Sequence, residues 1–532
     1  SNYLCHYRLE MAQSDPLQKP HYVSLQALSE WSGLTKTGDL SESNLLEDNS
    51  PLWSKVTSTI DNCLGQECPN YSDCFISEAR KKAQEADIVV INHHLLMSDM
   101  ALKASGRGEI LPSADAYIID EAHQLPEIAT QFLGDRISSH QIYELCRDSI
   151  SEMEQDASDM ARIKDYADKT EASMRTFRQS VGDKEQRTPW LTMLEKLGVK
   201  NKLADLIDAL DDLARQLEIA AERGKGLEQC HTRCNELIDT LALFSQEHGD
   251  DNKVLWIDIR NTSLVLHATP QEVSQYFQQW MDEKPTSWIF TSATLTVAGK
   301  FNNFNHQLGI NESETAIWPS PFDYKKQSLL YMPNIPVEPK DESYNTHIAE
   351  IAKDIISHSK GRTFLLFTSY RAMHSVADAL KDDMDDYPLM IQGTASKSSL
   401  LEEFRDHGNA VLLGTNSFWE GVDVRGEALS CVLIDKIPFA SPGDPVLQAR
   451  IDGLRERGGN PFSAIQIPAA VIQLKQGIGR LIRDPKDYGV LVLCDPRFLT
   501  KPYGKLFLRS LPTMPITQNS DDVAKFFDKK QI

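Results

Sequence analysis

The chain has 532 residues, 41% of them hydrophobic and 25% charged, which is typical of a globular protein with room for several domains. Its formal net charge of −22 excludes diffuse electrostatic binding to nucleic acid but leaves room for a local basic groove, since affinity depends on the phosphates neutralised at the site. No apolar run approaches the ~18 residues of a membrane span, the first residues are not a signal peptide, and an odd cysteine count argues against a disulfide framework, so we expect a soluble protein of a reducing cytosol.

A cysteine segment is the first distinctive feature in chain order. The stretch DNCLGQECPNYSDCF, residues 61–75, places Cys63, Cys68 and Cys74 at C-x4-C-x5-C spacing. An all-cysteine iron–sulfur or zinc site needs four thiolates, so the segment predicts a metal site with one ligand from elsewhere in the chain. The spacing leaves iron–sulfur and zinc both open and slightly favours iron, because the longer gap lies outside the range usual between zinc ligands.

The fourth ligand must come from the remaining cysteines, which are Cys5, Cys146, Cys230, Cys234, Cys431 and Cys494. Cys431 and Cys494 lie in strand-like apolar runs, where a thiol usually behaves as a small hydrophobe. Cys230 and Cys234 are four residues apart in a predicted helix, where packing is favoured over a private metal site.

Short apolar runs, most of them ending in polar residues, recur along the chain as ADIVVINHH, DAYIIDEAH, SWIFTSATL, GRTFLLFTSY, NAVLLGTNS, LSCVLIDKIPF and GVLVLCDPR. Continuous rather than alternating runs predict strands buried on both faces, and therefore parallel sheets covered by helices in an α/β fold. Functional residues in such sheets gather at the carboxyl ends of the strands, where the polar residues of these runs lie.

Between about residues 136 and 250 the strand-like runs give way to helix formers. The stretch NKLADLIDALDDLARQLEIAAERG repeats leucine at steps of three and four residues, at Leu203, Leu206, Leu210, Leu213 and Leu217. This spacing predicts a helix-packing stripe, and the simplest interpretation of the region is a helical insertion between two sheet-forming stretches. Further on, residues 326–345 are rich in proline and charge and predict a domain boundary.

Two adjacent carboxylates follow one of the predicted buried strands. YIIDEAHQLP places Asp120 and Glu121 at the end of the strand, with His123 close behind. One carboxylate can hold Mg²⁺ through its water shell while the other orients or deprotonates an attacking water, which suits nucleotide hydrolysis. A helix amino terminus with acidic residues in its first turn explains the string equally well, so both interpretations stay open at this point.

Two arginines three residues apart lie in QGIGRLIRD, residues 476–484. Arg480 and Arg483 share a helix face and suit the charge of a triphosphate, although a solvated basic face is the more usual explanation. Gly477 and Gly479 favour the functional interpretation, because glycine weakens a helix unless close backbone approach is needed.

Two polar loops follow other predicted strands. GTNSFWEGVD, residues 414–423, combines glycines, hydroxyls and carboxylates that suit contact with a nucleotide and a nucleic-acid backbone. TSATL, residues 291–295, offers small hydroxyls that suit a relay of nucleotide state, though alone it is a weak signal.

Taken together, DEAH, TSATL, FTSY, GTNSFWEGVD and QGIGRLIR, in this order over residues 120–483, resemble motifs II to VI of superfamily two helicases. The phrases VVINHHLL, SPFDY and FWEGVDVRGEALSCVLIDKIPFASPGDP are similar to the XPD/DinG branch of iron–sulfur helicases, and within it to the YoaA-like helicases of bacteria. The resemblance covers essentially the whole chain, and its later motifs are highly specific.

This resemblance implies an α/β fold with two RecA-like parallel-sheet motor domains and ATP between them. The first motor domain is expected to be incomplete and to be interrupted by an iron–sulfur domain and an all-helical arch. The implied domains are an iron–sulfur domain at 1–85, motor domain 1 at 86–135 and 285–325, the arch at 136–284, and motor domain 2 at 326–532.

The resemblance also assigns roles to residues. Asp120 and Glu121 would serve Mg²⁺ and water activation, His123 would couple to the second domain, and Ser292 and Thr294 would relay nucleotide state. The residues expected to face the ATP phosphates or complete the nucleotide cleft are Gln476, Arg480, Arg483, Gly421 and Asp423. The residues expected to contact the DNA strand or couple to it are Asn92, His93, Thr368, Ser369 and Thr415.

For the metal site the resemblance points to Cys5 as the fourth ligand, and to a [4Fe–4S] cluster with a structural role, held by Cys5, Cys63, Cys68 and Cys74. ATP and Mg²⁺ are the other implied cofactors. The implied activity is ATP-driven 5′→3′ unwinding of single-stranded or forked DNA in repair or replication, by a monomer in the bacterial cytosol that contacts replication or repair proteins and no membrane.

One expected motif is missing. The family hydrolyses ATP with a phosphate-cradling G-x-x-x-x-G-K-[ST] loop before the cysteines, and this sequence contains none. We therefore expect a fragment of a longer helicase that does not hydrolyse ATP by itself. Two alternatives stay open, which are a non-catalytic DNA-binding scaffold derived from a helicase and a zinc-stabilised nucleotide-binding switch.

Overall fold

The computed structural model describes residues 2–14, 20–43, 45–47, 50–59, 62–104, 109–246, 252–283, 286–381, 383–384, 386–419, 428–440 and 443–530. The chain forms two compact units. Unit 1 comprises Ser1–Tyr117, Gln124–Ser287 and Gly443–Ala449, and unit 2 comprises Ile118–His123, Trp288–Pro442 and Arg450–Ile532. No helix within the described ranges is long and apolar enough to cross a lipid bilayer.

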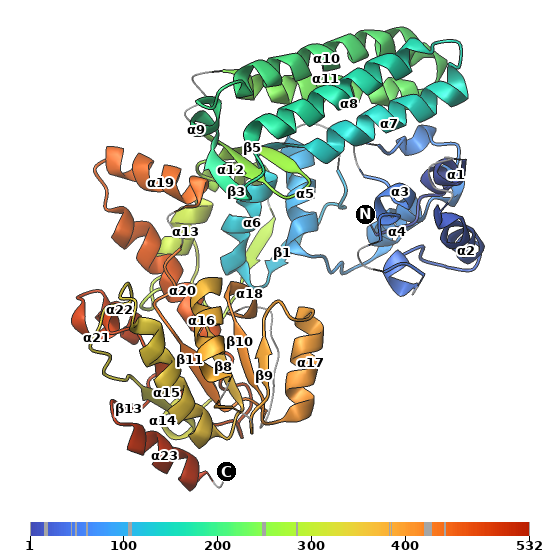
Figure 1. Cartoon of the computed structure of the whole chain (residues 1–532). Coiled ribbons are helices and arrows are strands. Elements are labelled where there is room, and N and C mark those ends of the chain that lie inside the picture. The colour runs from blue at the N-terminus through green and yellow to red at the C-terminus, as the bar shows by residue number, and fades with distance from the viewer. Residues whose placement is uncertain are drawn as a thin grey trace. The chain divides into compact units, whose positions relative to one another are not determined.

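Unit 2 is built on a seven-stranded sheet with strand order β13-β7-β12-β11-β8-β10-β9 (Figure 1). The strands are β7 (Ser328–Tyr331), β8 (Thr363–Leu366), β9 (Leu389–Ile391), β10 (Val411–Gly414), β11 (Cys431–Ile434), β12 (Gly489–Leu493) and β13 (Ile516–Thr517). All neighbouring strands pair in parallel, so their carboxyl ends meet at one edge of the sheet.

Alternate residues of these strands enter two hydrophobic cores, one on each face of the sheet. Phe364 and Leu412 belong to the core that is completed by α17 (Lys397–His407), α18 (Asn416–Trp419), α20 (Ile467–Ile478) and α22 (Gly504–Ser510). Leu365 and Leu413 belong to the core that is completed by α15 (Tyr344–Ser359), α16 (Tyr370–Leu380) and α23 (Ser520–Lys529).

Every residue of β7, β8, β10, β11 and β12 is buried, which confirms the prediction of strands buried on both faces. Cys431 and Cys494 lie in this core, where they pack as small hydrophobes as expected. The remaining helices that unit 2 contains or shares are α13 (Asn302–Leu308), α14 (Tyr324–Gln327), α19 (Pro445–Glu456) and α21 (Arg497–Thr500).

The cysteine-bearing part of unit 1 has its own small core. It consists of α1 (His6–Ser14), α2 (Tyr22–Ser32), α3 (Trp53–Val56) and α4 (Phe75–Glu85). Its buried apolar residues are Leu4, Leu9, Ala12, Leu25, Leu28, Leu40, Leu52 and Val56. Cys5 directly precedes α1 and Cys74 directly precedes α4, so helix starts carry two of the four candidate ligands.

A second part of unit 1 joins long helices to a small sheet. The helices are α7 (Ser139–Asp156), α8 (Arg162–Val181), α9 (Trp190–Leu194), α10 (Val199–Ala220) and α11 (Lys225–Ser245). The five leucines of the predicted stripe lie on α10, and each is at most 1% exposed, which confirms the packing prediction. Cys230 and Cys234 on α11 are buried in the same core and pack there as predicted.

The prediction of an all-helical arch over 136–284 is wrong. A four-stranded antiparallel sheet of order β2-β5-β4-β3 lies in this region, formed by β2 (Asp135–Ser138), β3 (Gln186–Pro189), β4 (Lys253–Ile259) and β5 (Leu264–Pro270). Ile257, Leu266 and other inward-facing strand residues complete the core of the long helices. The last long helix, α11, ends at Ser245, and β4 and β5, the two longest of the described strands, follow it within the region predicted to be all-helical.

β1 (Ala116–Ile119) and β6 (Ser287–Phe290) form a separate two-stranded sheet. Both strands were expected to be buried on both faces, yet Ile118 is 69% and Ile289 is 47% exposed. The strand expected within ADIVVINHH is also absent, since residues 86–92 pair with no described strand and Val90 is 92% exposed. Backbone in a strand needs a neighbour to accept its hydrogen bonds, and an apolar run alone does not supply one. The helices near these segments are α5 (His93–Ala104), α6 (Leu125–Phe132) and α12 (Ser274–Glu283).

Candidate functional site

The turn after β1 carries the two adjacent carboxylates of the sequence motif. Asp120 and Glu121 follow the last residue of β1, and both are exposed. Glu121 has a φ of 47°, a left-handed conformation that non-glycine residues adopt rarely and at a cost of about 1 kcal/mol or more. The hydroxyl of Thr291, which follows β6, donates to Asp120 Oδ1 at 3.0 Å, so the ends of two paired strands meet here.

Ser292 is the centre of a polar network around this turn. Its hydroxyl donates to Glu121 Oε2 at 2.9 Å and accepts from the backbone N–H of Thr294 at 3.1 Å. His123 Nδ1 lies 2.9 Å from Ser292 Oγ and 3.3 Å from Glu121 Oε2. The Glu121 side chain is 50% exposed and that of His123 only 5%, so the network leads from a solvent-accessible carboxylate into the interior of unit 2.

Gln476 of α20 completes the network. Its Nε2 lies 3.1 Å from His123 Nε2 and donates to Thr294 Oγ1 at 2.7 Å. All of these contacts are satisfied together when His123 carries its proton on Nδ1, because Nε2 can then accept from the Gln476 amide. Residues of the DEAH, TSATL and QGIGR strings therefore meet in one hydrogen-bonded chain of Glu121, His123, Ser292, Thr294 and Gln476, which we call the motif network. The hydrogen bond between Thr291 and Asp120 lies beside it in the sequence.

Lys475 adds a contact that the sequence did not reveal. Its Nζ donates to the carbonyl oxygen of Thr296 at 3.3 Å, and burial lowers the pKa of this amine. The residue therefore ties α20 to the loop that follows Thr294. Its position beside Gln476 carries no sequence signal that would distinguish it from a surface lysine.

Arg480 contacts the last residue of α18. Its Nε and Nη2 donate to the carbonyl oxygen of Trp419 at 3.1 and 2.9 Å. The close approach inferred for Gly477 is present, because a Cβ at this position would lie 3.0 Å from the Trp419 ring. At Gly479 only carbonyl oxygens of its own helix lie nearby. The prediction that Arg480 and Arg483 share a helix face is wrong, because α20 ends at Ile478 and neither arginine is helical. The backbone N–H of Arg483 donates to Asp487 Oδ2 at 2.8 Å. The expected roles of both arginines toward ATP phosphates stay predictions.

Gly421 and Asp423, which were expected to complete the nucleotide cleft, lie outside the described residues. Their assignment stays a prediction. Trp419, which stands just before this stretch, is fully buried in the core of unit 2.

The three hydroxyl residues expected near DNA make contacts within unit 2. Thr368 donates its backbone N–H to Asp435 Oδ1 at 3.0 Å, and Ser369 caps α16 by accepting from the N–H of Ala372. Thr415 donates both its N–H and its hydroxyl to Gln392 Oε1, at 2.6 and 3.0 Å. These contacts fix the loops after β8 and β10, and contact with DNA stays a prediction.

Asp435 is a buried carboxylate that the sequence analysis missed. It follows β11, is 1% exposed, and burial raises its pKa to about 7 despite the N–H of Thr368 and the nearby Lys436. The equivalent residue after β12, Asp495, is bound by Arg497 at 2.6 Å and by the backbone N–H of Ile437 at 2.9 Å. The rule that polar residues gather at the carboxyl ends of parallel strands would have found both aspartates.

Asn92 and His93 belong to unit 1, apart from the motif network of unit 2. The Asn92 side chain accepts from the N–H of Leu95 at 2.8 Å and so caps the start of α5. This contact accounts for Asn92 structurally, and a role toward DNA stays a prediction for both residues.

Two of the four candidate metal ligands lie near others of the set, because Cys5 is influenced by Cys63 and Cys68, and Cys68 by Cys63 and Cys74. Burial raises the pKa of the Cys5 thiol, and the neighbouring Cys68 and Cys63 raise it further, while the backbone N–H of Arg8 lowers it. Burial also raises the pKa of the Cys68 thiol, and Cys63 and Cys74 add to this effect. All four are free thiols and at least partly accessible, whereas the other five cysteines are buried. The chemistry of the donors suits a four-thiolate group, but among the described residues no three histidine, cysteine or acidic side chains lie close enough together to hold a metal ion, so the metal site stays a prediction.

Comparison with known proteins identifies the family. Residues 352–514 match the model of the helicase C-terminal domain. The chain is 42% identical, over 99% of its length and 83% of the other protein, to the ATP-dependent DNA helicase YoaA of Escherichia coli K12. The chain belongs to the XPD/DinG helicase family.

Other members of the XPD/DinG family match over similar lengths. The YoaA helicase of Haemophilus influenzae is 40% identical over the whole chain and 83% of its own length, and the ATP-dependent helicase DinG of Mycobacterium tuberculosis H37Rv is 32% identical over 94% of the chain and 74% of its own length. A solved XPD helicase structure covers 84% of the chain and 76% of its own length with a TM-score of 0.52 at 18% identity, which shows a shared α/β fold with parallel sheets.

Proposed function

We propose that this chain works as the motor of an ATP-dependent DNA helicase of the YoaA type, with 5′→3′ polarity and a role in repair or replication. The observation that carries the proposal is the motif network, in which three strings from distant parts of the sequence share one set of hydrogen bonds. Membership of the XPD/DinG family supports the assignment of those strings to nucleotide hydrolysis.

The two carboxylates divide the chemistry of hydrolysis between them. Asp120, which Thr291 holds by a hydrogen bond, would bind Mg²⁺ through its water shell. Glu121 is half exposed, and the strained turn aims its carboxylate toward solvent, where it would orient the attacking water and take its proton. Ser292 donates to the same carboxylate, so a change in the charge or position of Glu121 reaches the rest of the network directly.

His123, Thr294 and Gln476 would carry the state of the nucleotide to α20. An imidazole protonated on Nδ1 joins Ser292 on one side to Gln476 on the other. Displacement of Glu121 by a bound nucleotide would break or re-form contacts with Ser292, and the segment directly after α20 carries the two arginines that are proposed to face the phosphates. Single-stranded or forked DNA would be the substrate, and Thr368, Ser369 and Thr415 are proposed to contact or couple to it.

A [4Fe–4S] cluster is the second part of the proposal, held by Cys5, Cys63, Cys68 and Cys74. When bound, the cluster supplies a covalent cross-link between the start of α1 and the loop before α4, with no need for electron transfer. The four accessible thiols and the backbone N–H of Arg8 directed at Cys5 support this assignment. Stoichiometric zinc without iron in the purified protein would contradict it and support the nucleotide-switch alternative.

The remaining proposals follow from the family. The protein would act as a monomer in the bacterial cytosol and would contact replication or repair proteins. Because the 532 residues contain no phosphate-cradling loop, we propose that they do not hydrolyse ATP without a segment that supplies one.

The direct test is ATP hydrolysis by the natural gene product, with and without single-stranded DNA. We expect DNA to stimulate hydrolysis and Glu121→Gln to reduce it by at least ~100-fold, since the variant keeps the shape of the side chain but cannot take a proton. Glu127→Gln, an exposed glutamate on α6, is the matched control and should retain the wild-type rate. Binding of DNA without any hydrolysis in the wild type would favour the scaffold alternative.

A further inference from the structure

The residues that follow Cys5 are anchored in the long-helix part of unit 1. Cys5 is held locally, since its N–H donates to the carbonyl oxygen of Val56 at 2.8 Å and the N–H of Leu9 donates to its own carbonyl oxygen at 2.9 Å. Two polar side chains in the first turn of α1, Tyr7 and Arg8, leave the cysteine-bearing part and reach α7.

A buried charge triad forms the first of these anchors. Arg8 Nη1 donates to Asp148 Oδ1 of α7 at 2.8 Å, and Arg233 Nη1 of α11 donates to Asp148 Oδ2 at 2.7 Å. The three residues are 6 to 7% exposed. Burial opposes ionisation of Asp148, but the guanidiniums of Arg8 and Arg233 outweigh it and hold the pKa of this carboxyl below its usual range.

The second anchor joins Tyr7 to Glu152, one helical turn further along α7. The Tyr7 hydroxyl lies 2.8 and 2.9 Å from the two carboxylate oxygens of Glu152. Gly226, in the first turn of α11, makes room for this carboxylate, because a Cβ there would lie 1.8 Å from Glu152 Oε2. Any other residue at 226 would displace the acceptor of Tyr7.

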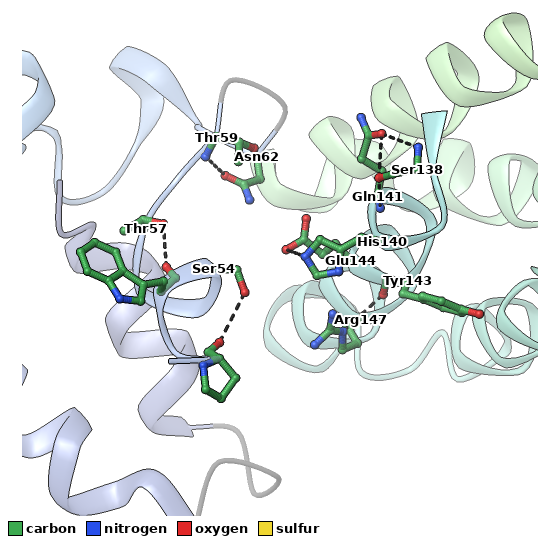
Figure 2. A network of polar contacts seen from close by, with 12 residues as sticks. Ser54, Thr57, Thr59, Asn62, Ser138, His140, Gln141, Tyr143, Glu144 and Arg147 are labelled. Atoms are coloured by element: carbon green, nitrogen blue, oxygen red, sulfur yellow. Dashed lines mark hydrogen bonds and ion pairs between the residues drawn. The ribbon is translucent and has the colours of Figure 1, made fainter. Parts of the chain in front are cut away.

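A third contact starts from the cysteine loop itself. Lys225 Nζ at the start of α11 lies 2.6 Å from Glu67 Oε2, and Glu67 directly precedes Cys68. Figure 2 shows Ser54 and Thr57 on the side that faces His140 and Arg147 of α7. Burial lowers the pKa of Lys55, which lies next to Ser54, and the nearby guanidinium of Arg147 lowers it further.

From these contacts we infer that Asp148 and Glu152 of α7, together with Arg233 of α11, are positioning residues for the metal ligand Cys5. They fix α1 from outside the cysteine segment, more than 140 residues along the chain, and so hold the Cys5 thiol against the loop that carries the other three cysteines. The inference rests on the proposed function only for the identity of the metal.

The physical argument is the cost of leaving one partner alone. Removal of the Asp148 charge takes away the carboxylate that bridges the Arg8 and Arg233 guanidiniums and leaves their mutual repulsion less compensated. Loss of one partner of a buried ion pair destabilises far more than the loss of an exposed pair. Relief of that repulsion requires α1 to move away from α7 and α11, and Cys5 moves with α1 because it directly precedes the helix. The other three cysteines lie on a separate loop and do not follow this motion.

The experiment compares Asp148→Asn with Asp212→Asn in the purified protein. Asp212 on α10 also bridges two cations, Lys169 at 2.7 Å and Arg215 at 3.1 Å, but at the surface, so it controls for the loss of one carboxylate on a long helix. Two quantities are measured at a temperature where the far-ultraviolet circular dichroism of both variants equals that of the wild type. The first is the rate at which an iron chelator bleaches the visible absorption, and the second is the alkylation rate of each cysteine in metal-free protein, followed by mass spectrometry.

We expect Asp148→Asn to speed both cluster bleaching and Cys5 alkylation by at least ~10-fold, with Cys63 alkylation and the Asp212→Asn variant unchanged. Wild-type protein without iron, combined with faster Cys5 alkylation in Asp148→Asn, would overturn the cluster but not the positioning role. Unchanged Cys5 alkylation in Asp148→Asn would overturn the positioning role whichever metal is bound.

A milder variant covers the case in which Asp148→Asn does not fold. Tyr7→Phe removes only the hydroxyl that donates to Glu152 and keeps the packing of the ring. Its Cys5 alkylation should rise by about 3- to 10-fold, the range expected for one partly buried hydrogen bond to a carboxylate. A wild-type rate in Tyr7→Phe would contradict the inference.

Discussion

Two polar networks join distant parts of this sequence, one in each unit, and they differ in chemistry. The triad of Arg8, Asp148 and Arg233 in unit 1 consists of full charges that are less than 10% exposed. The motif network in unit 2 consists of hydroxyls, an imidazole and an amide that lead to the half-exposed carboxylate of Glu121.

This difference indicates different tasks. A buried ion triad has one good arrangement and a large penalty for any other, which suits a fixed scaffold. A chain of neutral hydrogen bonds that ends at an accessible carboxylate can exchange partners at little cost, which suits a site whose state changes with a ligand. The first network is expected to govern stability and the second to govern activity.

The largest expected effect on stability comes from Asp148→Asn. The variant removes the carboxylate that bridges two buried guanidiniums, so the free energy of unfolding of the long-helix part should fall by about 3–5 kcal/mol. The measurement is chemical denaturation followed by circular dichroism. Asp212→Asn, at the exposed pair, should leave the transition where it is, and equal losses in the two variants would erase the distinction between buried and exposed networks.

Asp435 sharpens the comparison, because it is a buried carboxylate without the paired guanidiniums of Asp148. Its folded-state pKa of about 7 lies above the ordinary value of 3.8, so the folded protein holds more protons between these values and this contribution to stability falls as the pH rises from 4 to 7. Asp435→Asn should abolish this loss and be more stable than the wild type at pH 8 by up to about 4 kcal/mol.

The pH effect is measured as the difference in unfolding free energy between Asp435→Asn and the wild type at pH 5 and pH 8. Asp148, whose pKa is lowered, behaves oppositely, since its contribution is present above the unfolded-state pKa and is lost as the pH falls through the folded value. A difference that does not change between pH 5 and pH 8 would show that the folded-state pKa of Asp435 is close to its ordinary value, so that the carboxylate is ionised at both pH values.

The smallest expected effect on stability, with a clear effect on activity, comes from Gln476→Ala. The variant removes the amide that joins His123 to Thr294, so we expect unwinding per ATP hydrolysed to fall by about 10-fold while the unfolding free energy changes by less than about 1 kcal/mol. Thr294→Ser keeps the hydroxyl that accepts from Gln476 and should retain coupling, whereas Thr294→Val should behave like Gln476→Ala. Loss of stability without loss of coupling would place Gln476 among scaffold residues.

The sequence predicted the seven-stranded sheet of unit 2 well, because each apolar run there forms a strand that pairs with neighbouring strands. VLLG, CVLI and GVLVL become fully buried strands, and the leucines of α10 form the expected stripe. The same reasoning failed for residues 86–92 and for the exposed faces of β1 and β6, where an apolar run is present but the neighbours that would bury it are not among the described residues.

The site was predictable in part. Asp120, Glu121, His123, Ser292, Thr294 and Gln476 were found from their strings, and the structure brings them together. The contacts that depend only on three-dimensional packing were not predictable, since nothing near Arg8 or Asp148 in the sequence indicates that these residues meet. Asp435 lies between these cases, as a polar residue at a strand end whose burial becomes clear only in the folded sheet.

The most direct test of the account is unwinding of forked DNA by the natural gene product in the presence of ATP and Mg²⁺. We predict that a fork with a 5′ single-stranded tail is unwound, that a fork with only a 3′ tail is not, and that Glu121→Gln abolishes unwinding while DNA binding persists. Unwinding that survives Glu121→Gln, or an absence of unwinding by a wild-type protein that carries its cluster, would contradict the account.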